Sequence, residues 1–219
     1  MPEELTLFSL PLFPLGTVLY PGGTLPLRIF EVRYLDMIGK CHKTDAPFGI
    51  VSLNHGSEVR KIDSKPGSDG FVQEEFNTVG TLATITNFSA SQPGLISICC
   101  KGDQRFRISN KEKLRHGLWI AEVTRVDDDA EIRIPDDLKP IANALGKLIS
   151  TLEQRDVEAG HQMPVARPYR LNDCGWVANR WCELLPIPTE LKQRLMELEN
   201  PLLRLELAGD ILERTGIAL

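Results

Sequence analysis

LFSLPLFPLGTVLYPGGTLPLRIFEVRY, the stretch from Leu7 to Tyr34, determines how the first part of this chain folds. It consists of short apolar runs separated by proline and glycine, and it ends where the apolar residues take up helical spacing. Proline and glycine at such points end strands and form turns. The stretch therefore predicts short β-strands that are followed by a helix. The separating residues are Pro11, Pro14, Gly16, Pro21, Gly22 and Gly23.

The chain up to Asp127 continues in the same style. In Arg105-Phe106-Arg107-Ile108 the arginines alternate with apolar residues, which is typical of a half-buried strand. Gly102 lies in a Lys-Gly-Asp sequence that predicts a turn between two strands. Many short strands with proline and glycine corners favour a small barrel, closed or partly closed. The predicted strands are residues 5–10, 24–29, 47–53, 80–88, 95–101, 104–109 and 118–126.

The composition changes at Asp127-Asp128-Asp129, and the pattern beyond it is helical. Apolar residues recur at helical spacing between 138 and 152, and again in three later segments. Asn172 or Asp173 can cap the second helix, Thr189 the third, and Asn200-Pro201 begins the fourth. We therefore predict an α+β protein with a β-barrel-like subdomain at residues 1–127 and a helical bundle subdomain at residues 128–219.

The formal charge of −5 is unevenly distributed. Residues 1–127 contain 14 Lys/Arg and 14 Asp/Glu, whereas residues 128–219 contain 11 and 16. Proteins that bind nucleic acid usually have the opposite balance, so nucleic acid is not expected as the partner. No run approaches the roughly 18 apolar residues of a membrane-spanning helix, and the chain begins with Met-Pro-Glu-Glu. We expect a cytoplasmic protein with no membrane partner.

The sequence lacks the residues that ATP hydrolysis requires. A phosphate-binding loop has the pattern Gly-x-x-x-x-Gly-Lys-Ser/Thr. Here the pairs Gly39-Lys40 and Gly146-Lys147 precede Cys41 and Leu148, and neither of those side chains can hold magnesium. The histidines and the five cysteines show no spacing such as the Cys-x-x-Cys of structural zinc sites. We predict no catalytic residues, no cofactor and no metal.

Four motifs resemble the N-terminal domain family of Lon proteases. They are the opening stretch quoted above, Gly80-Thr81-Leu82-Ala83, residues 102–108 (GDQRFRI) and residues 184–193 (LLPIPTELKQ). The resemblance implies a PUA-like β-barrel that is followed by a helical subdomain. It also implies a domain that contributes to substrate recognition, and the 219 residues leave no room for the ATPase and peptidase modules of a full Lon protease. We therefore expect a stand-alone protein of this family.

The function that the resemblance implies is non-catalytic. It is the recognition of unfolded or extended polypeptide, or an adaptor role towards a protease partner, and the protein is not expected to be an enzyme. The client and the oligomeric state stay open at this stage.

Three apolar side chains are candidates for the binding surface. Phe71 and Phe76 lie in the polar segment Asn54–Thr78, and Trp176 lies five residues before Trp181 on a predicted helix, so the two tryptophans point in different directions. Exposed apolar residues at such places suit recognition of extended polypeptide. The other interpretation is that the two phenylalanines anchor the polar segment onto the barrel.

A basic stretch suggests an alternative function, a PUA-like RNA-binding module. As a patch it could hold RNA phosphates or another anionic partner. The other interpretation is a solvated strand face whose cations pair with the acidic helical part. The residues are Lys101, Arg105, Arg107, Lys111, Lys113 and Arg115.

Overall fold

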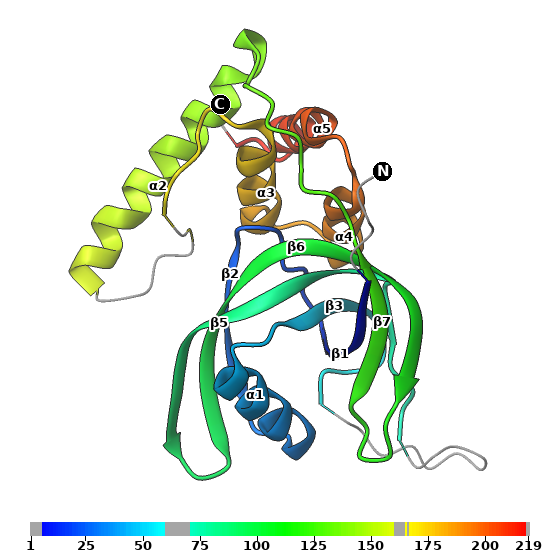
Figure 1. Ribbon diagram of the computed structural model, residues 1–219. Coiled ribbons are helices and arrows are strands. Elements are labelled where there is room, and N and C mark those ends of the chain that lie inside the picture. The colour runs from blue at the N-terminus through cyan, green and yellow to red at the C-terminus, as the bar shows by residue number, and fades with distance from the viewer. Residues whose placement is uncertain (1–5, 60–70, 160–164, 166, 218–219) are drawn as a thin grey trace. The chain divides into compact units, whose positions relative to one another are not determined.

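The computed structural model describes residues 6–59, 71–159, 165 and 167–217 (Figure 1). The chain forms two compact units. The first, here called the β unit, extends to Asp127 except for Gly22–Thr24, and the second, the helical unit, comprises Gly22–Thr24 and the chain from Asp128. The division falls in the acidic triplet at which the composition changes.

Five strands of the β unit form a closed ring in the order β1-β7-β6-β5-β3, because β1 pairs with both β7 and β3. The β1–β3 pairing is parallel and the other four are antiparallel. Closure leaves the ring itself without an edge. The predicted order, a barrel of strands followed by helices, is confirmed. The strands are β1 (Thr6–Leu15), β2 (Thr24–Ile29), β3 (Phe48–His55), β4 (Glu75–Phe76), β5 (Val79–Gln92), β6 (Leu95–Lys113) and β7 (Trp119–Arg125).

The strand β6 differs from the prediction, because the predicted turn at Gly102 is wrong. β6 runs without a break through that glycine, which pairs with Ala83 of β5. A Cβ atom at Gly102 would lie 2.4 Å from the carbonyl oxygen of Tyr20. The glycine therefore serves a close approach of two backbone segments rather than a turn.

The ring strands bury their two faces in different cores. Leu12 and its neighbour Phe13 belong to different apolar clusters, as expected when successive side chains point to opposite faces. Every ring strand contributes to the interior cluster, in which Phe106 is fully buried. A Cβ atom at Gly49 or Gly80 would lie 2.7 Å or 2.6 Å from its ring, so these glycines provide the space for it.

Helix α1 (Val32–Thr44) covers the outer face. Its apolar side chains recur at helical spacing, as predicted, and are buried against strands of the ring. The ring of Tyr34 stacks on that of Phe13 with centroids 4.1 Å apart. Near the end of the helix, His42 stacks on Phe88 of β5, also at 4.1 Å. These contacts attach α1 to the barrel.

The helical unit contains four α-helices within the described residues, and a short 3-10 helix, η1 (Asp136–Leu138), precedes them. Asp173 caps α3 by accepting a hydrogen bond from the amide of Trp176 at 2.7 Å, and Asn200 caps α5. The predicted cap at Thr189 is wrong, because Pro188 is the N-cap residue of α4 and Thr189 is its first residue. The helices are α2 (Lys139–Ala159), α3 (Cys174–Leu184), α4 (Thr189–Glu197) and α5 (Pro201–Arg214).

Candidate functional site

The three apolar candidates from the sequence are less accessible than expected. Phe71 is half-buried, Phe76 is 5% exposed and Trp176 is 9% exposed. Phe76 belongs to the interior core of the barrel, and the amide of Trp176 is held by the cap of α3. Their role in partner binding stays a prediction, and more exposed side chains have to contribute most of any contact area.

Phe76 is part of a cluster of aromatic and cationic side chains in the β unit. Its ring meets that of Trp119 edge-on, with centroids 5.3 Å apart. The ammonium of Lys111 lies 4.2 Å from the centroid of Phe76, and that of Lys113 lies 5.5 Å from the centroid of Trp119. Both distances are within the range of cation–π attraction. Phe76, from the apolar candidates, thus contacts Lys111, from the basic stretch, although the sequence suggested the two sets separately.

A buried carboxylate, that of Glu74, adjoins this cluster. It accepts hydrogen bonds from Arg33 at 2.7 and 3.3 Å and from the indole of Trp119 at 2.8 Å, and Lys113 lies 3.9 Å away. Arg33, which is 4% exposed, also donates to Glu31 and to the carbonyl oxygen of Gly117. Burial lowers the pKa of Arg33, but hydrogen bonding to Glu74 and the nearby negative charges leave it raised.

This network attaches Glu74, close to the end of the polar segment Asn54–Thr78, to the start of α1 and to the turn between β6 and β7. Its charges compensate one another, and each contact joins parts of the same unit. For Phe76 and its neighbours the structure thus favours the anchoring interpretation.

The basic stretch is divided between two faces of β6. Arg107 is opposite Thr124, whereas Lys111 is opposite Ala121, which belongs to the interior core. The pairing shifts between Ile108 and Asn110, because one extra residue forms a β-bulge there. The bulge reverses the faces of the residues that follow, so the six cations do not form one patch.

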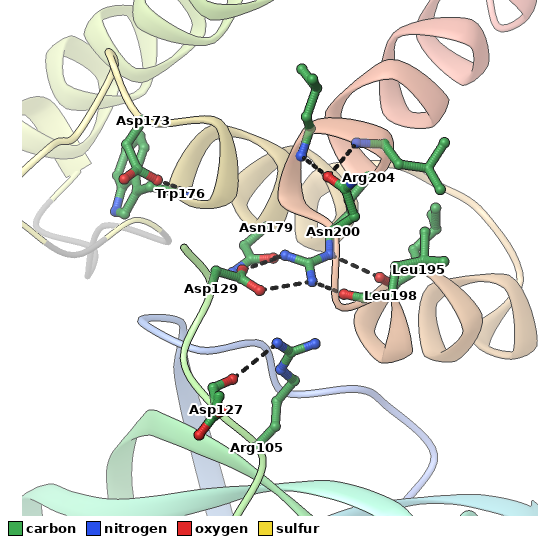
Figure 2. Close-up of polar contacts among 12 residues, drawn as sticks. Arg105, Asp127, Asp129, Asp173, Trp176, Asn179, Leu195, Leu198, Asn200 and Arg204 are labelled. Atoms are coloured by element: carbon green, nitrogen blue, oxygen red, sulfur yellow. Dashed lines mark hydrogen bonds and ion pairs between the residues drawn. The ribbon is translucent and has the colours of Figure 1, made fainter. Parts of the chain in front are cut away.

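Arg105 is the most deeply buried of the six, at 3% exposure, and donates to the carbonyl oxygen of Asp127 at 3.4 Å (Figure 2). Lys113 is half-buried. The exposed members are Lys101, Arg107, Lys111 and Arg115. An anionic partner could reach these four, although Arg107 and Lys111 lie on different faces of β6 and Arg115 lies in the turn that follows the strand.

The helical unit has its own buried arginine, Arg204, which the sequence analysis did not single out. Its guanidinium donates to both carboxylate oxygens of Asp129, at 2.5 and 3.1 Å, and to the side chain of Asn179 at 3.0 Å (Figure 2). It also donates to the carbonyl oxygens of Leu195, at 2.9 Å, and Leu198. Arg204 thus joins α5 to α3, to the end of α4 and to the segment before η1.

An apolar groove lies in the same unit, between α2, α3 and Ile217, three residues beyond the end of α5. Its volume is about 390 Å³, within the usual range for pockets that bind small ligands. Among the residues that the structure describes, the exposed Lys147 is the only charged one that lines it. The lining residues are Ala144, Lys147, Leu148, Trp181, Leu184, Leu185 and Ile217.

The tryptophan that lines this groove is Trp181, and Trp176 is not among the lining residues. Trp181 is 3% exposed, and its indole N–H donates to the carbonyl oxygen of Ile141 at 3.0 Å. One feature of the sequence could have indicated this groove. Leu184 and Leu185 follow Trp181 and widen the apolar stripe of α3, and a wide stripe can extend beyond the surface that a single neighbouring helix covers.

The thiols do not resemble nucleophiles. All five cysteines are buried, and burial raises the pKa of Cys100 to about 12, with a further contribution from the charge of Cys99. A thiol with so high a pKa is protonated at neutral pH and reacts poorly. Among the described residues no three His, Cys, Asp or Glu side chains come together as metal ligands would.

Within the part of the chain that the structure describes, no helix combines the length and the apolar character needed to cross a bilayer.

The chain matches the protein family described as the ATP-dependent protease La (LON) substrate-binding domain over residues 9–214. It is 24% identical over 210 residues to Lon protease 2 of Myxococcus xanthus and 24% identical over 211 residues to the Lon protease of Anaeromyxobacter dehalogenans. Each alignment covers 94% of this chain and 23% of the relative. The chain therefore spans only a minor part of the length of these relatives.

Two solved structures are similar along almost the whole chain. A Lon N-terminal domain protein from Xanthomonas campestris has a TM-score of 0.64 and 28% identity, with coverage of 92% of this chain and 96% of that one. The N-terminal domain of the Mycobacterium avium complex Lon protease has a TM-score of 0.57 and 17% identity, with coverage of 96% and 100%. The second likeness concerns the fold alone.

Proposed function

The chain belongs to the family of the LON substrate-binding domain, and from this membership we propose that it is a non-catalytic module that recognises unfolded or extended polypeptide. The family match is to the substrate-binding domain, not to an ATPase or a protease module. Affinity for such clients comes mainly from the burial of apolar side chains.

The observation that carries this proposal is the apolar groove of the helical unit. Leu148 and Leu184 are half-buried at its wall, and the indole of Trp181 lines it. A groove of this kind can take one or two apolar side chains of a client while the client backbone stays solvated. Polypeptides that are folded hide such side chains, so the groove favours unfolded ones.

In the cell we propose an adaptor role, in which the module delivers clients to a protease or withholds them from it. The relatives that it matches are Lon proteases, which makes a protease the partner to test. We further propose a cytoplasmic location, supported by five buried cysteines that form no disulfide.

The test is a binding titration with a labelled, uncharged peptide that contains Leu and Phe. We expect Leu148→Glu to weaken binding about tenfold or more, because the groove would have to hold a charge beside the apolar side chain. The matched control is Leu203→Glu on α5, which introduces the same charge at a position that is 41% exposed and does not line the groove. Equal affinity of the two variants would contradict this site, and absence of binding to the wild type would contradict the function.

A parallel titration uses single-stranded RNA at about 50 mM and about 200 mM salt, a range over which binding to phosphates weakens strongly. The RNA-binding alternative requires salt-sensitive affinity that is lost in the double variant Arg107→Glu and Lys111→Glu. The side chains of Arg107 and Lys111 are both exposed, although Lys111 also lies against the ring of Phe76, so circular dichroism has to verify that the variant folds. Such a result would replace the polypeptide proposal.

A further inference from the structure

The β unit has one long strand edge that no described strand covers. β3 pairs with β5 only from Thr81 to Ala83, and β6 pairs with the opposite side of β5 along most of its length. Beyond Ala83, among the residues that the structure describes, no strand pairs with the outer side of Thr84–Gln92. This segment is here called the outer edge of β5. An unpaired edge of this kind presents backbone N–H and C=O groups with which another strand can pair.

The composition of this edge lacks the usual protection. Its sequence, TITNFSASQ, contains no charged residue, no proline and no glycine. Natural proteins normally protect edge strands with lysine, proline or a short length. The other strand beside this part of the sheet, β2, pairs with β6 and carries Pro26 and Arg28. One margin of the sheet thus has protecting residues, and the outer edge of β5 does not.

The edge also presents suitable side chains. Ile85 and Phe88 are half-buried and pack against the outer core beneath α1, where Phe88 stacks on His42. Thr86 and Asn87 are exposed. The pairing with β6 shifts at Thr86 and is regular again at Asn87, Phe88 and Ser89. A strand added beside Asn87–Ser89 could pack apolar side chains next to Ile85 and Phe88.

We propose that the outer edge of β5 binds client polypeptide by β-strand addition, so that an extended segment becomes the next strand of the sheet. This inference rests on the proposed function and names the client: an uncharged, extended segment with an apolar side chain at every second position. Backbone hydrogen bonds supply affinity without regard to sequence, and the alternate side chains supply selectivity. The mode suits a module that has to accept many unfolded chains.

The test uses a labelled seven-residue peptide of alternating Val and Ser, and a copy whose backbone is N-methylated at alternate residues. N-methylation removes N–H donors and leaves every side chain in place. We expect the methylated copy to bind about tenfold more weakly or worse, because several backbone hydrogen bonds are lost together. In hydrogen exchange, amides of residues 84–92 should become protected when the unmethylated peptide is added. Equal affinity of the two peptides would overturn the inference.

A pair of protein variants locates the site. Thr86→Lys adds a charge beside the outer edge, at an exposed position, and removes the hydrogen bond from the Thr86 hydroxyl to the carbonyl oxygen of Cys99 on β6; it should weaken binding about tenfold. Asn110→Lys adds the same charge at an exposed position of β6 that is opposite Glu122, and should leave binding unchanged. Circular dichroism verifies that both variants fold.

The remaining outcomes separate this inference from the function on which it rests. If Leu148→Glu abolishes binding of the peptide and Thr86→Lys does not, polypeptide recognition stands and strand addition is overturned. If the wild type binds neither the Val/Ser peptide nor the Leu/Phe peptide of the earlier titration, both are overturned; if it binds only the Leu/Phe peptide, strand addition alone is overturned. If the wild type forms a dimer in analytical ultracentrifugation that Thr86→Lys dissociates, the occupant of the edge is a second copy of the chain, and the inference about clients is wrong.

Discussion

Arg33 in the β unit and Arg204 in the helical unit are both buried, yet they stabilise their units in different ways. Arg33 contacts two carboxylates, those of Glu31 and Glu74, and one carbonyl oxygen. Arg204 contacts one carboxylate, that of Asp129, together with an amide side chain and two carbonyl oxygens near the end of α4.

The difference follows from which backbone hydrogen-bonding groups each architecture leaves without a partner. In a closed ring of strands most backbone groups are paired, so a buried arginine mainly serves side chains. A helix leaves its last carbonyl groups without partners, and a buried helix end has to find donors elsewhere. Arg204 supplies such donors to Leu195 and Leu198. The helical unit therefore depends on a single side chain more strongly than the β unit does.

Removal of Arg204 should give the largest effect. Arg204→Ala leaves Asp129 and two carbonyl oxygens without their cation, and we expect a loss of about 4 kcal/mol in the free energy of unfolding of the helical unit. Urea unfolding measures this loss, and hydrogen exchange should show it in α3–α5 rather than in β5 and β6. Arg194→Ala, at an exposed position of α4, is the control and should change stability by less than about 0.5 kcal/mol.

The interior of the ring should be the next most sensitive part. In Gly80→Ala the new Cβ atom would lie 2.4 Å from the carbonyl oxygen of Ile50, and we expect a loss of about 3 kcal/mol. The matched change Gly39→Ala, on α1, has no atom within 4 Å and should increase stability by about 0.5–1 kcal/mol. Thermal unfolding of both variants measures the two changes in stability. If both changes had the same sign, the conclusion that the interior has no room for a methyl group at Gly80 would be wrong.

Glu74→Gln should have a smaller effect, about 2 kcal/mol, because it removes a charge-assisted hydrogen bond and keeps the shape of the side chain. Arg33 would retain Glu31 and the carbonyl of Gly117. In the double variant that combines Glu74→Gln with Arg33→Met, the loss in the free energy of unfolding should be smaller than the sum of the losses in the two single variants. The reason is that Arg33 and Glu74 are direct hydrogen-bond partners. Additive losses in urea unfolding would show that the pair is not coupled, and would remove the contrast drawn here between the two arginines.

The smallest effect concerns alkaline pH and is absent at neutrality. Burial raises the pKa of Cys100 in the folded protein to about 12, from the ordinary thiol value of 9.0. The folded state therefore holds the thiol proton more tightly than the unfolded state. The contribution of the protonated thiol to the free energy of unfolding is complete below pH 9 and declines as the pH rises towards 12. In Cys100→Ser this part of the decline should disappear. The measurement is unfolding free energy against pH for both proteins, and parallel curves above pH 9 would contradict it.

Much of the fold could be predicted because its signals are local. Alternation of apolar residues indicated strands, and Asn200 and Asp173, one of the two predicted alternatives, cap helices. The prediction that Pro11 and Pro14 separate short strands was wrong, because β1 runs through both of them from Thr6 to Leu15. Gly102 was misinterpreted, because a glycine that permits a close backbone approach looks the same in sequence as one that forms a turn. The candidate site was harder to predict: the apolar groove joins residues from α2, α3 and Ile217, which are far apart in the chain.

By itself the sequence determined the class of the fold, the change from strands to helices at the acidic triplet and the family resemblance, because each depends on neighbouring residues. The tertiary structure alone decided where the functional side chains lie. One bulge at Ile108–Asn110 separated Arg107 from Lys111, and ring closure brought Phe76 to Trp119. Strand register and helix packing set these contacts, and both arise from interactions between residues that are distant in the chain.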